Sequence, residues 1–199
     1  MEVEKIIFAA EMEEKIPPGE YMMYQNVVTQ IEFERMLSES GPYGGIIMRP
    51  YDGDIPKKIA FIQIQTQTDE DEYSPIAFKF LLQEAKSTEE RGVGVDSCIF
   101  AREIHEDTGE IKSLKIQNIK VTETEATKNL RLKYAVEGEK EEKEEEFEMV
   151  VLSVGFSLPE HVKEMGTLMG VKPEEIECRA PTVEFEILKT EKDRIFIAV

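Results

Sequence analysis

Four side chains of this 199-residue chain have the chemistry of nucleophiles, general bases or metal ligands: Cys98, Cys178, His105 and His161. Cys98 lies in the apolar run SCIFA and His105 follows a few residues later, so a cysteine nucleophile activated by a histidine is one interpretation. A thiol inside a strand is instead typical of a buried, inert cysteine. We expect the inert thiol, and we predict no catalytic residue in this chain.

Metal ligation and hydrolysis have no matching motif. The chain contains no Cys-x-x-Cys pair, and neither histidine has a cysteine or a second histidine at ligand spacing. An iron–sulfur or structural zinc site therefore lacks a ligand set. No Gly-x-Ser-x-Gly elbow is present, which argues against serine hydrolase chemistry. The sequence thus predicts no metal site.

The charge balance narrows the choice of partners. The chain has 42 acidic and 24 basic residues, a formal net charge of −18. Such a chain repels phosphate backbones and anionic lipid surfaces, so we expect neither nucleic acid nor membrane as a partner. A basic protein partner fits better, and the alternative is that the charge serves only solubility. No apolar run reaches the length of a membrane helix, and the N-terminus lacks a signal-peptide pattern, so we predict a cytoplasmic protein.

The first hundred residues predict alternating strands and helices. Residues 5–10 (KIIFAA) form an apolar strand, and Thr29 with Glu32 forms a capping box for a helix that ends near Glu39. Residues 58–65 (KIAFIQIQ) are a strong strand candidate. Ser74-Pro75 then begins a helix to about Arg91, and SCIFA is the next strand. Together these segments predict a β-α-β unit with parallel strands.

The second half predicts a β-meander followed by a strand, a helix and two closing strands. Residues 114–121 and 130–136 are strand-like, and the charge run 138–146 (GEKEEKEEE) is interpreted as a solvated hairpin tip rather than an interaction patch. The apolar run 148–155 predicts a strand.

A helix starting after Leu158-Pro159 should end at Gly170, with Met165 and Met169 packed in the core. Two strands, at 183–188 and 194–199, close the chain. Because the last strand is apolar to its final residue, we expect that a larger domain would continue from there. The predicted fold is α/β, a Rossmann-like three-layer domain with a mainly parallel sheet and a β-meander.

Specific runs resemble the A subunit of heterodisulfide reductase, a thioredoxin-reductase-like flavoprotein. NVVTQIEFERMLSESGP (26–42) is similar to that family's linker helix, and Arg49-Pro50-Tyr51-Asp52-Gly53 resembles its Arg-Pro-Ser-Asp-Gly. KIAFIQ (58–63) and MVVLSVG (149–155) resemble two of its strands. The resemblance implies the pyridine-nucleotide domain fold. It implies that residues 1–56 correspond to the connection from the flavin domain, and residues 57–199 to an NAD(P)-domain-like α/β domain with a return strand.

The departures from the family concern its cofactors. Where the family continues with Cys-Val-Gly-Ser-Arg-Asp, this chain has Ile64 to Asp69 without cysteine or glycine, followed by further acids up to Glu72. A pyrophosphate needs a glycine turn at the helix N-terminus, and these acids would repel it. The family's flavin-binding Ala-Thr-Gly turn is Ala9-Ala10-Glu11 here, and no Gly-x-Gly-x-x-Gly is present. The resemblance implies FAD in the family, but we expect no cofactor in the isolated chain.

Three hypotheses follow from this comparison. The first is a non-catalytic accessory or docking subunit in an electron-transfer complex, with a protein partner. The chain would be either a degenerate stand-alone relative of the family or a fragment whose missing parts lie elsewhere. The second is an oxidoreductase subunit that binds FAD or NAD(P) by a non-standard site, for which Arg35, Arg49 and Thr66 are the candidate cofactor contacts. The third is a scaffold without any redox link, because fold does not imply function.

Overall fold

The computed structural model describes residues 4–9, 13–64, 75–91, 94–157, 159–171, 187–189 and 194–198. These residues form two compact units. Unit 1 combines residues 1–15 with residues 156–199, and unit 2 comprises residues 16–155. The boundary predicted after residue 56 falls within unit 2, and the assignment of its two sides to flavin-like and nicotinamide-like parts stays a prediction.

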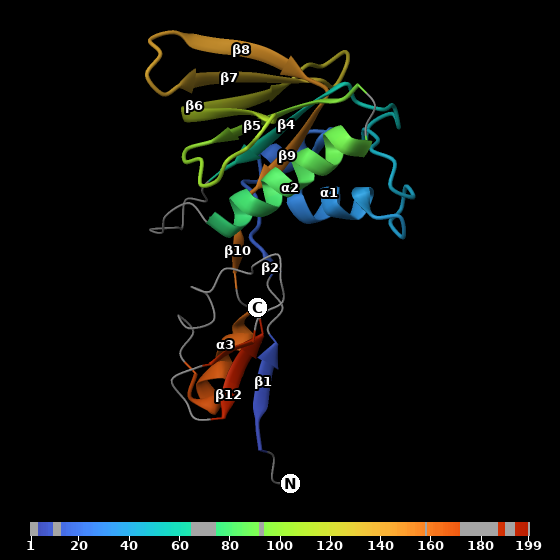
Figure 1. Ribbon diagram of the computed structural model, residues 1–199. Helices are drawn as coiled ribbons and strands as arrows, with labels where there is room; N and C mark the ends of the chain where they lie inside the picture. The colour runs from blue at the N-terminus through green and yellow to red at the C-terminus, as the bar shows by residue number, and fades with distance from the viewer. Residues whose placement is uncertain are drawn as a thin grey trace. The chain divides into compact units, whose positions relative to one another are not determined.

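Unit 2 is built on a seven-stranded sheet in the order β3-β9-β4-β5-β6-β7-β8 (Figure 1). Strands β3 (Val27–Thr29), β9 (Met149–Ser153), β4 (Lys58–Gln63) and β5 (Asp96–Ala101) run parallel. Strand β6 (Lys112–Glu123) starts parallel to β5 and continues antiparallel to β7 (Leu130–Val136). Strand β8 (Glu142–Phe147) closes the meander beside β7. The predicted β-α-β unit and β-meander are confirmed.

Two helices cover one face of the parallel strands (Figure 1). Helix α1 (Gln30–Leu37) begins with the predicted capping box: Thr29 accepts from the Glu32 backbone, and Glu32 accepts from Thr29 N. Helix α2 (Pro75–Arg91) has the predicted bounds. The helices bury apolar side chains against the sheet, with an edge-to-face pair formed by Phe33 and Phe61 at 5.4 Å. Burial of this kind is the main stabilising contribution to the layer.

The meander forms the third layer on the opposite face. Buried side chains of the parallel strands, among them Ile62 and Phe100, pack with meander side chains such as Leu132, Tyr134 and Phe147. Phe100 makes edge-to-face contacts with Tyr134 at 4.9 Å and with Phe147 at 5.6 Å. Each inner strand therefore has both faces buried, which explains its almost continuous apolar sequence. The three-layer prediction is confirmed.

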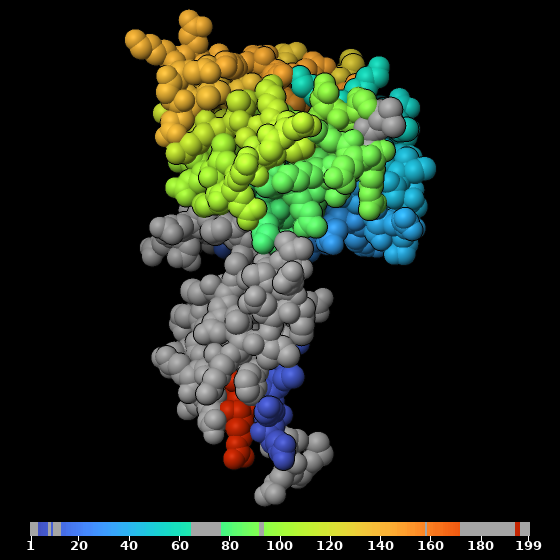
Figure 2. All heavy atoms as spheres, viewed as in Figure 1, coloured from blue at the N-terminus to red at the C-terminus, as the bar shows by residue number. Residues whose placement is uncertain are grey.

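The structure corrects the prediction that the charge run 138–146 is a hairpin tip. Residues 142–147 are not a hairpin tip but the edge strand β8, and only the residues around Gly138 form the turn. Outward-facing cations on β7 hold the strand, with Arg131 Nε 3.2 Å from Glu144 and Lys133 Nζ 2.7 Å from Glu142. Figure 2 shows the β7–β8 hairpin (orange) standing out from the surface of unit 2. The run was misread because the outer face of β8 is charged, so no apolar alternation marks the strand.

Unit 1 contains two small sheets and helix α3. Strand β1 (Ile6–Ala9) pairs parallel with β12 (Ile195–Ala198), which pairs antiparallel with β11 (Ile187–Lys189). Strands β2 (Glu13–Glu14) and β10 (Phe156–Ser157) form an antiparallel pair.

Helix α3 (Glu160–Met169) ends at Gly170, whose φ of 72° is the left-handed conformation typical of a helix C-cap. Met165 is 49% exposed and Leu168 is 88% exposed. The predicted core role of Met165 is therefore wrong: helical spacing alone did not show whether that face of α3 has a neighbour.

Candidate functional site

The carboxyl edge of the parallel strands is the first place to look for a ligand in an open α/β sheet. Strands β3, β9 and β4 end there at Thr29, Ser153 and Gln63. Helices α1 and α2 both begin on this side, because each follows a parallel strand in the chain. The polar side chains of this edge therefore determine what it could bind.

Buried hydrogen bonds connect three elements at this edge. Ser153 Oγ donates to Gln30 Oε1 at 2.9 Å, and Gln30 Nε2 donates to the Ala77 carbonyl at 3.3 Å. Ser153 is fully buried and Gln30 is 2% exposed. We call Gln30, Ala77 and Ser153 the carboxyl-edge bridge, since they join β9 to the first turns of α1 and α2. Gln63, which is also buried, pairs with Ser153 in the register of β4 and β9.

The carboxyl-edge bridge is made of an amide, a hydroxyl and a carbonyl. None of these groups titrates near neutral pH, so the bridge can position or bind but cannot act as a general acid or base. The sequence interpretation missed it because Gln30 was quoted only within the run 26–42, which resembles a linker helix of the family. The polar ends of two otherwise apolar strands, at Gln63 and Ser153, were the signal available in the sequence.

His105 follows β5 and does not pair with Cys98. Its ring packs edge-to-face on Phe78 of α2 at 5.7 Å, and its Nε2 is 3.9 Å from Glu103 Oε2. Cys98 instead packs among the residues facing the meander, on the opposite side of the sheet. Burial raises the pKa of the Cys98 thiol to about 11, so the sulfur stays protonated at neutral pH. The expectation of an inert thiol agrees with this geometry, whereas Cys178 lies outside the described residues.

Arg35, a predicted cofactor contact, is exposed on α1 and lines a pocket of about 350 Å³. Besides Arg35, the walls combine the Glu32 carboxylate with apolar side chains from β3, α1 and the loop after α1: Val27, Val28, Met36, Pro42, Tyr43 and Pro50. A guanidinium beside an apolar pocket suits an anionic ligand with an apolar body. The role of Arg35 as a cofactor contact stays a prediction.

Arg49 lies elsewhere and has protein partners. Its Nη2 donates to the Thr127 carbonyl at 2.7 Å and is 3.2 Å from Asp52 Oδ2. Only 8% of Arg49 is exposed. The structure therefore does not bring Arg49 into the pocket of Arg35, and its proposed cofactor contact stays a prediction. Thr66, the third candidate, lies outside the described residues.

Asn26 completes a polar network around Arg49. Fully buried, it donates from Nδ2 to the Lys128 carbonyl at 3.0 Å and accepts at Oδ1 from Tyr51 N at 3.1 Å. We call Asn26, Arg49 and Asp52 the clasp, since Asn26 and Arg49 tie the segments before β3 and before β4 to the β6–β7 turn. The sequence analysis quoted Asn26 and Asp52 only for their resemblance to a family and named Arg49 as a cofactor contact; in the structure all three lie in this network.

Within the described ranges, no group of three or more His, Cys, Asp and Glu side chains is arranged to hold a metal ion. The helices of the described part of the chain include none that is long and apolar enough to cross a membrane.

Known proteins resemble this chain in sequence and, more distantly, in structure. No family model matches the chain. A solved structure that resembles it is the Cu(II) complex of the HOCl-induced flavoprotein disulfide reductase RclA from Escherichia coli, with a TM-score of 0.46 and 12% identity. That alignment covers 98% of this chain and 38% of the other.

Curated relatives are the A subunits of heterodisulfide reductases. The A subunit of the H2/formate:CoB-CoM heterodisulfide,ferredoxin reductase of Methanococcus maripaludis is 26% identical over 168 residues, covering 76% of this chain and 26% of the relative. The A subunit of the ferredoxin:CoB-CoM heterodisulfide reductase of Methanosarcina mazei is 28% identical over 163 residues, covering 74% and 21%.

A shorter segment is more similar. The second iron-sulfur A subunit of the CoB–CoM heterodisulfide reductase of Methanopyrus kandleri is 58% identical over 43 residues, covering 22% of this chain and 7% of the relative. The chain spans about a quarter or less of the length of these relatives. The resemblance predicted from the sequence is confirmed: the chain is a relative of the heterodisulfide reductase A subunits, similar to a segment of those longer proteins.

Proposed function

We propose that this protein is a non-catalytic accessory or docking subunit of an electron-transfer complex. The observation that carries the proposal is the carboxyl-edge bridge. At the edge where an open α/β sheet binds a nucleotide, the ends of β9, α1 and α2 are joined by buried side-chain hydrogen bonds. The sequence from Ile64 to Asp69 contains no glycine, so it lacks the tight turn by which backbone N–H groups approach a pyrophosphate.

Electrostatics favours the same conclusion. The four consecutive acids from Asp69 to Glu72 precede Pro75, the first residue of α2. A helix N-terminus attracts a phosphate through its free N–H groups, and neighbouring carboxylates oppose that attraction. At a separation of about 4 Å, two unit charges interact by roughly 1 to 4 kcal/mol in aqueous or surface environments. Four acids so near in sequence to the helix N-terminus therefore disfavour an anionic ligand there.

The partner is expected to be a protein. The relatives are subunits by name, and the net charge of −18 favours association with a basic surface. To test the proposal, the tagged chain would be expressed in its native host and purified under anoxic conditions. We expect iron–sulfur or flavin-containing proteins to co-elute with it in size-exclusion chromatography at a fixed stoichiometry. Elution of the chain alone at physiological salt would contradict the docking role.

A second candidate function is favoured by the pocket beside Arg35. In this alternative, the chain is an oxidoreductase subunit that binds FAD or NAD(P) by a non-standard site. The apolar walls around Tyr43 would hold an aromatic ring, and the Arg35 guanidinium would meet a phosphate. The test is a titration with FAD and with NADPH. Saturable binding that is weakened at least tenfold by Arg35→Gln, and unchanged by Arg102→Gln at an exposed position after β5, would favour this alternative.

The pairing in unit 1 supports the proposed correspondence of the chain's two ends. Strands β1 and β12 come from opposite ends of the sequence and pair in parallel along four residues. Both resemble strands of the family's flavin domain. We propose that the two ends of the chain correspond to strands of that domain, which would separate residues 156–199 from the NAD(P)-domain-like part that the sequence analysis placed at 57–199.

A further inference from the structure

The loop after α1 returns to that helix and encloses the pocket beside Arg35, which we call the Arg35 pocket. Gly41 allows this return, because a Cβ at that position would collide with the Arg35 carbonyl oxygen. The next two residues, Pro42 and Tyr43, form part of the pocket wall. The volume of about 350 Å³ is at the small end of ligand sites, which suits a small metabolite.

Two opposite charges line the Arg35 pocket without pairing with each other. Glu32 and Arg35 are three residues apart on α1, a spacing at which side chains share one helix face. The two side chains nevertheless form no ion pair in the described part of the chain. Glu32 is held instead at the helix start, where its Oε2 accepts from Thr29 N at 2.9 Å. A carboxylate accepts several hydrogen bonds, so Glu32 can still accept one from a ligand.

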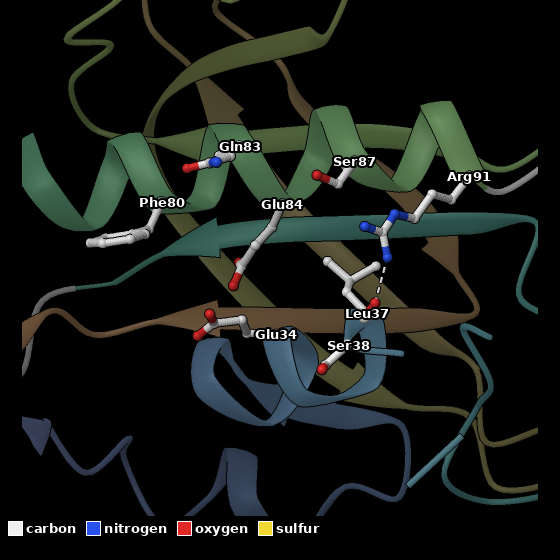
Figure 3. Close-up of a pocket in the computed structure, with 8 residues that line it drawn as sticks. All are labelled: Glu34, Leu37, Ser38, Phe80, Gln83, Glu84, Ser87 and Arg91. Carbon is white, nitrogen blue, oxygen red and sulfur yellow. Dashed lines mark hydrogen bonds between the residues drawn. The ribbon is translucent and has the colours of Figure 1, made fainter. Parts of the chain in front are cut away.

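Arg35 differs from the arginines that hold the fold together. In the pocket between α1 and α2, Arg91 Nη1 donates to the Leu37 carbonyl at the end of α1 (Figure 3). Arg49 donates to the Thr127 carbonyl. The exposed Arg35 guanidinium, in contrast, makes no hydrogen bond or ion pair with the residues that the structure describes. It is therefore available to an anionic group of a ligand.

The charges and the walls of the Arg35 pocket together specify one class of ligand. A ligand with only an anionic group would be repelled by Glu32, and one with only an amine would be repelled by Arg35. An α-amino acid carries a carboxylate and an ammonium group on one carbon atom, so it matches both. Because it has no net charge, the charge of −18 on the chain does not oppose its approach. The apolar walls, which include Val27, Met36 and Tyr43, favour an apolar side chain on that amino acid.

We propose that the Arg35 pocket binds a free α-amino acid with an apolar side chain. Arg35 binds the carboxylate, Glu32 accepts from the ammonium group, and the side chain packs against the apolar walls. The inference goes beyond the docking function proposed above and does not depend on it.

The experiment is an NMR titration of the full chain with L-leucine, L-methionine and L-phenylalanine, followed through assigned backbone amides. We expect saturable shifts with at least one of the three, confined to residues 27–36 and 43–51. Two analogues of the amino acid that binds each lack one charge: the amide lacks the carboxylate, and the deaminated acid lacks the ammonium group. Each analogue should bind at least tenfold more weakly than the amino acid.

Substitutions assign the two charges to their residues. Arg35→Gln should weaken amino-acid binding at least tenfold. Glu32→Gln removes the charge but keeps a capping side chain, because glutamine also serves at that position of a capping box. It should weaken amino-acid binding severalfold without weakening binding of the deaminated acid. The matched controls Glu34→Gln, exposed on α1 outside the pocket, and Arg102→Gln should leave binding unchanged.

Several results would overturn the inference. One is the absence of a saturable response to all three amino acids at millimolar concentration. Equal affinity for either analogue would show that the two charges do not act together, and full binding by Arg35→Gln would place the ligand elsewhere. Binding of FAD that is lost in Arg35→Gln, without amino-acid binding, would assign the pocket to the cofactor alternative. The titration needs no redox partner, so its failure removes only this inference, whereas elution of the native chain alone would remove the proposed function.

Discussion

The two edges of the same parallel sheet differ in what their polar groups do. At the amino edge, Asn26 precedes β3 and, with Arg49, fastens neighbouring loops to the β6–β7 turn. At the carboxyl edge, Ser153 and Gln30 bond to each other within the fold. The amino edge uses residues that resemble the family's sequence, whereas the loop after the carboxyl edge departs from it. We therefore expect the amino edge to serve the scaffold, and the loop after the carboxyl edge to lack nucleotide contacts.

The amino edge also has a charged cluster. Lys58, the first residue of β4, lies 2.5 Å from Glu145 on β8, and Tyr134 donates to the same carboxylate at 3.0 Å. Lys58 Nζ is 4.8 Å from the centre of the Phe147 ring. These contacts connect the parallel strands to the meander. Through Glu145, the acidic edge strand β8 is thus bonded to β4 of the parallel sheet and to β7.

The largest effect is expected from Asn26→Ala. The substitution leaves the Tyr51 N–H and the Lys128 carbonyl without their buried partner. We expect the free energy of unfolding to fall by about 2 to 3 kcal/mol, measured by urea denaturation. The control Asn118→Ala, at an exposed position on β6, should change it by less than about 0.5 kcal/mol. Equal effects of the two substitutions would contradict the clasp.

Arg49→Gln sharpens the comparison, because Arg49 was predicted as a cofactor contact. If its role is the clasp, losing the bond to Thr127 should reduce the free energy of unfolding by about 1 to 2 kcal/mol. Arg35→Gln is the matched control on the surface and should change stability by less than about 0.5 kcal/mol. A stable Arg49→Gln variant that loses affinity for FAD would instead support a cofactor role.

A smaller effect is expected at the carboxyl edge. Ser153→Ala removes one buried hydrogen bond to Gln30, and we expect a loss of about 1 kcal/mol in unfolding experiments. We expect the variant still to fail to bind NADH, because the glycine turn that a pyrophosphate needs is also absent from the sequence. Recovery of NADH binding in Ser153→Ala would show that the bridge alone excludes the cofactor.

The smallest effect concerns pH. Burial acts to raise the pKa of Glu145, but hydrogen bonds from Lys58 and Tyr134 outweigh it and hold the pKa below its usual value of 4.5. The ionised carboxylate therefore stabilises the fold above about pH 4.5, and this contribution is lost as the pH falls further. We expect the stability difference between the wild type and Glu145→Gln to be constant at neutral pH and to shrink below pH 4.5. A difference independent of pH from 7 to 3 would contradict this ion pair.

Much of the fold could be predicted because local signals agreed with the tertiary structure. The capping box at Thr29 and the Pro75 start of α2 mark helices, and the apolar runs at 58–63 and 149–153 mark buried strands. Strand β8 was not predicted because its outer face carries charged residues, such as Glu142, which forms an ion pair with Lys133. In the sequence such a charged run looks like a solvated loop.

The candidate site was harder to predict than the fold. The carboxyl-edge bridge joins Gln30, Ala77 and Ser153 from three separate segments, and no local spacing relates them. Arg49 was chosen for its charge, but its long-range contact with Thr127 shows why an arginine is placed there. These partners lie 47 to 123 residues apart in the sequence, so their contacts depend on the tertiary fold, which residue types alone do not specify.

The most direct test of the central claim is calorimetric titration of the purified chain with FAD and with NADH, alongside its absorbance spectrum. The account predicts a colourless protein that binds neither compound up to millimolar concentration, because buried hydrogen bonds join β9, α1 and α2 at the carboxyl edge and acids precede α2 in the sequence. A flavin band in the purified protein, or saturable binding of either nucleotide at micromolar concentration, would contradict it.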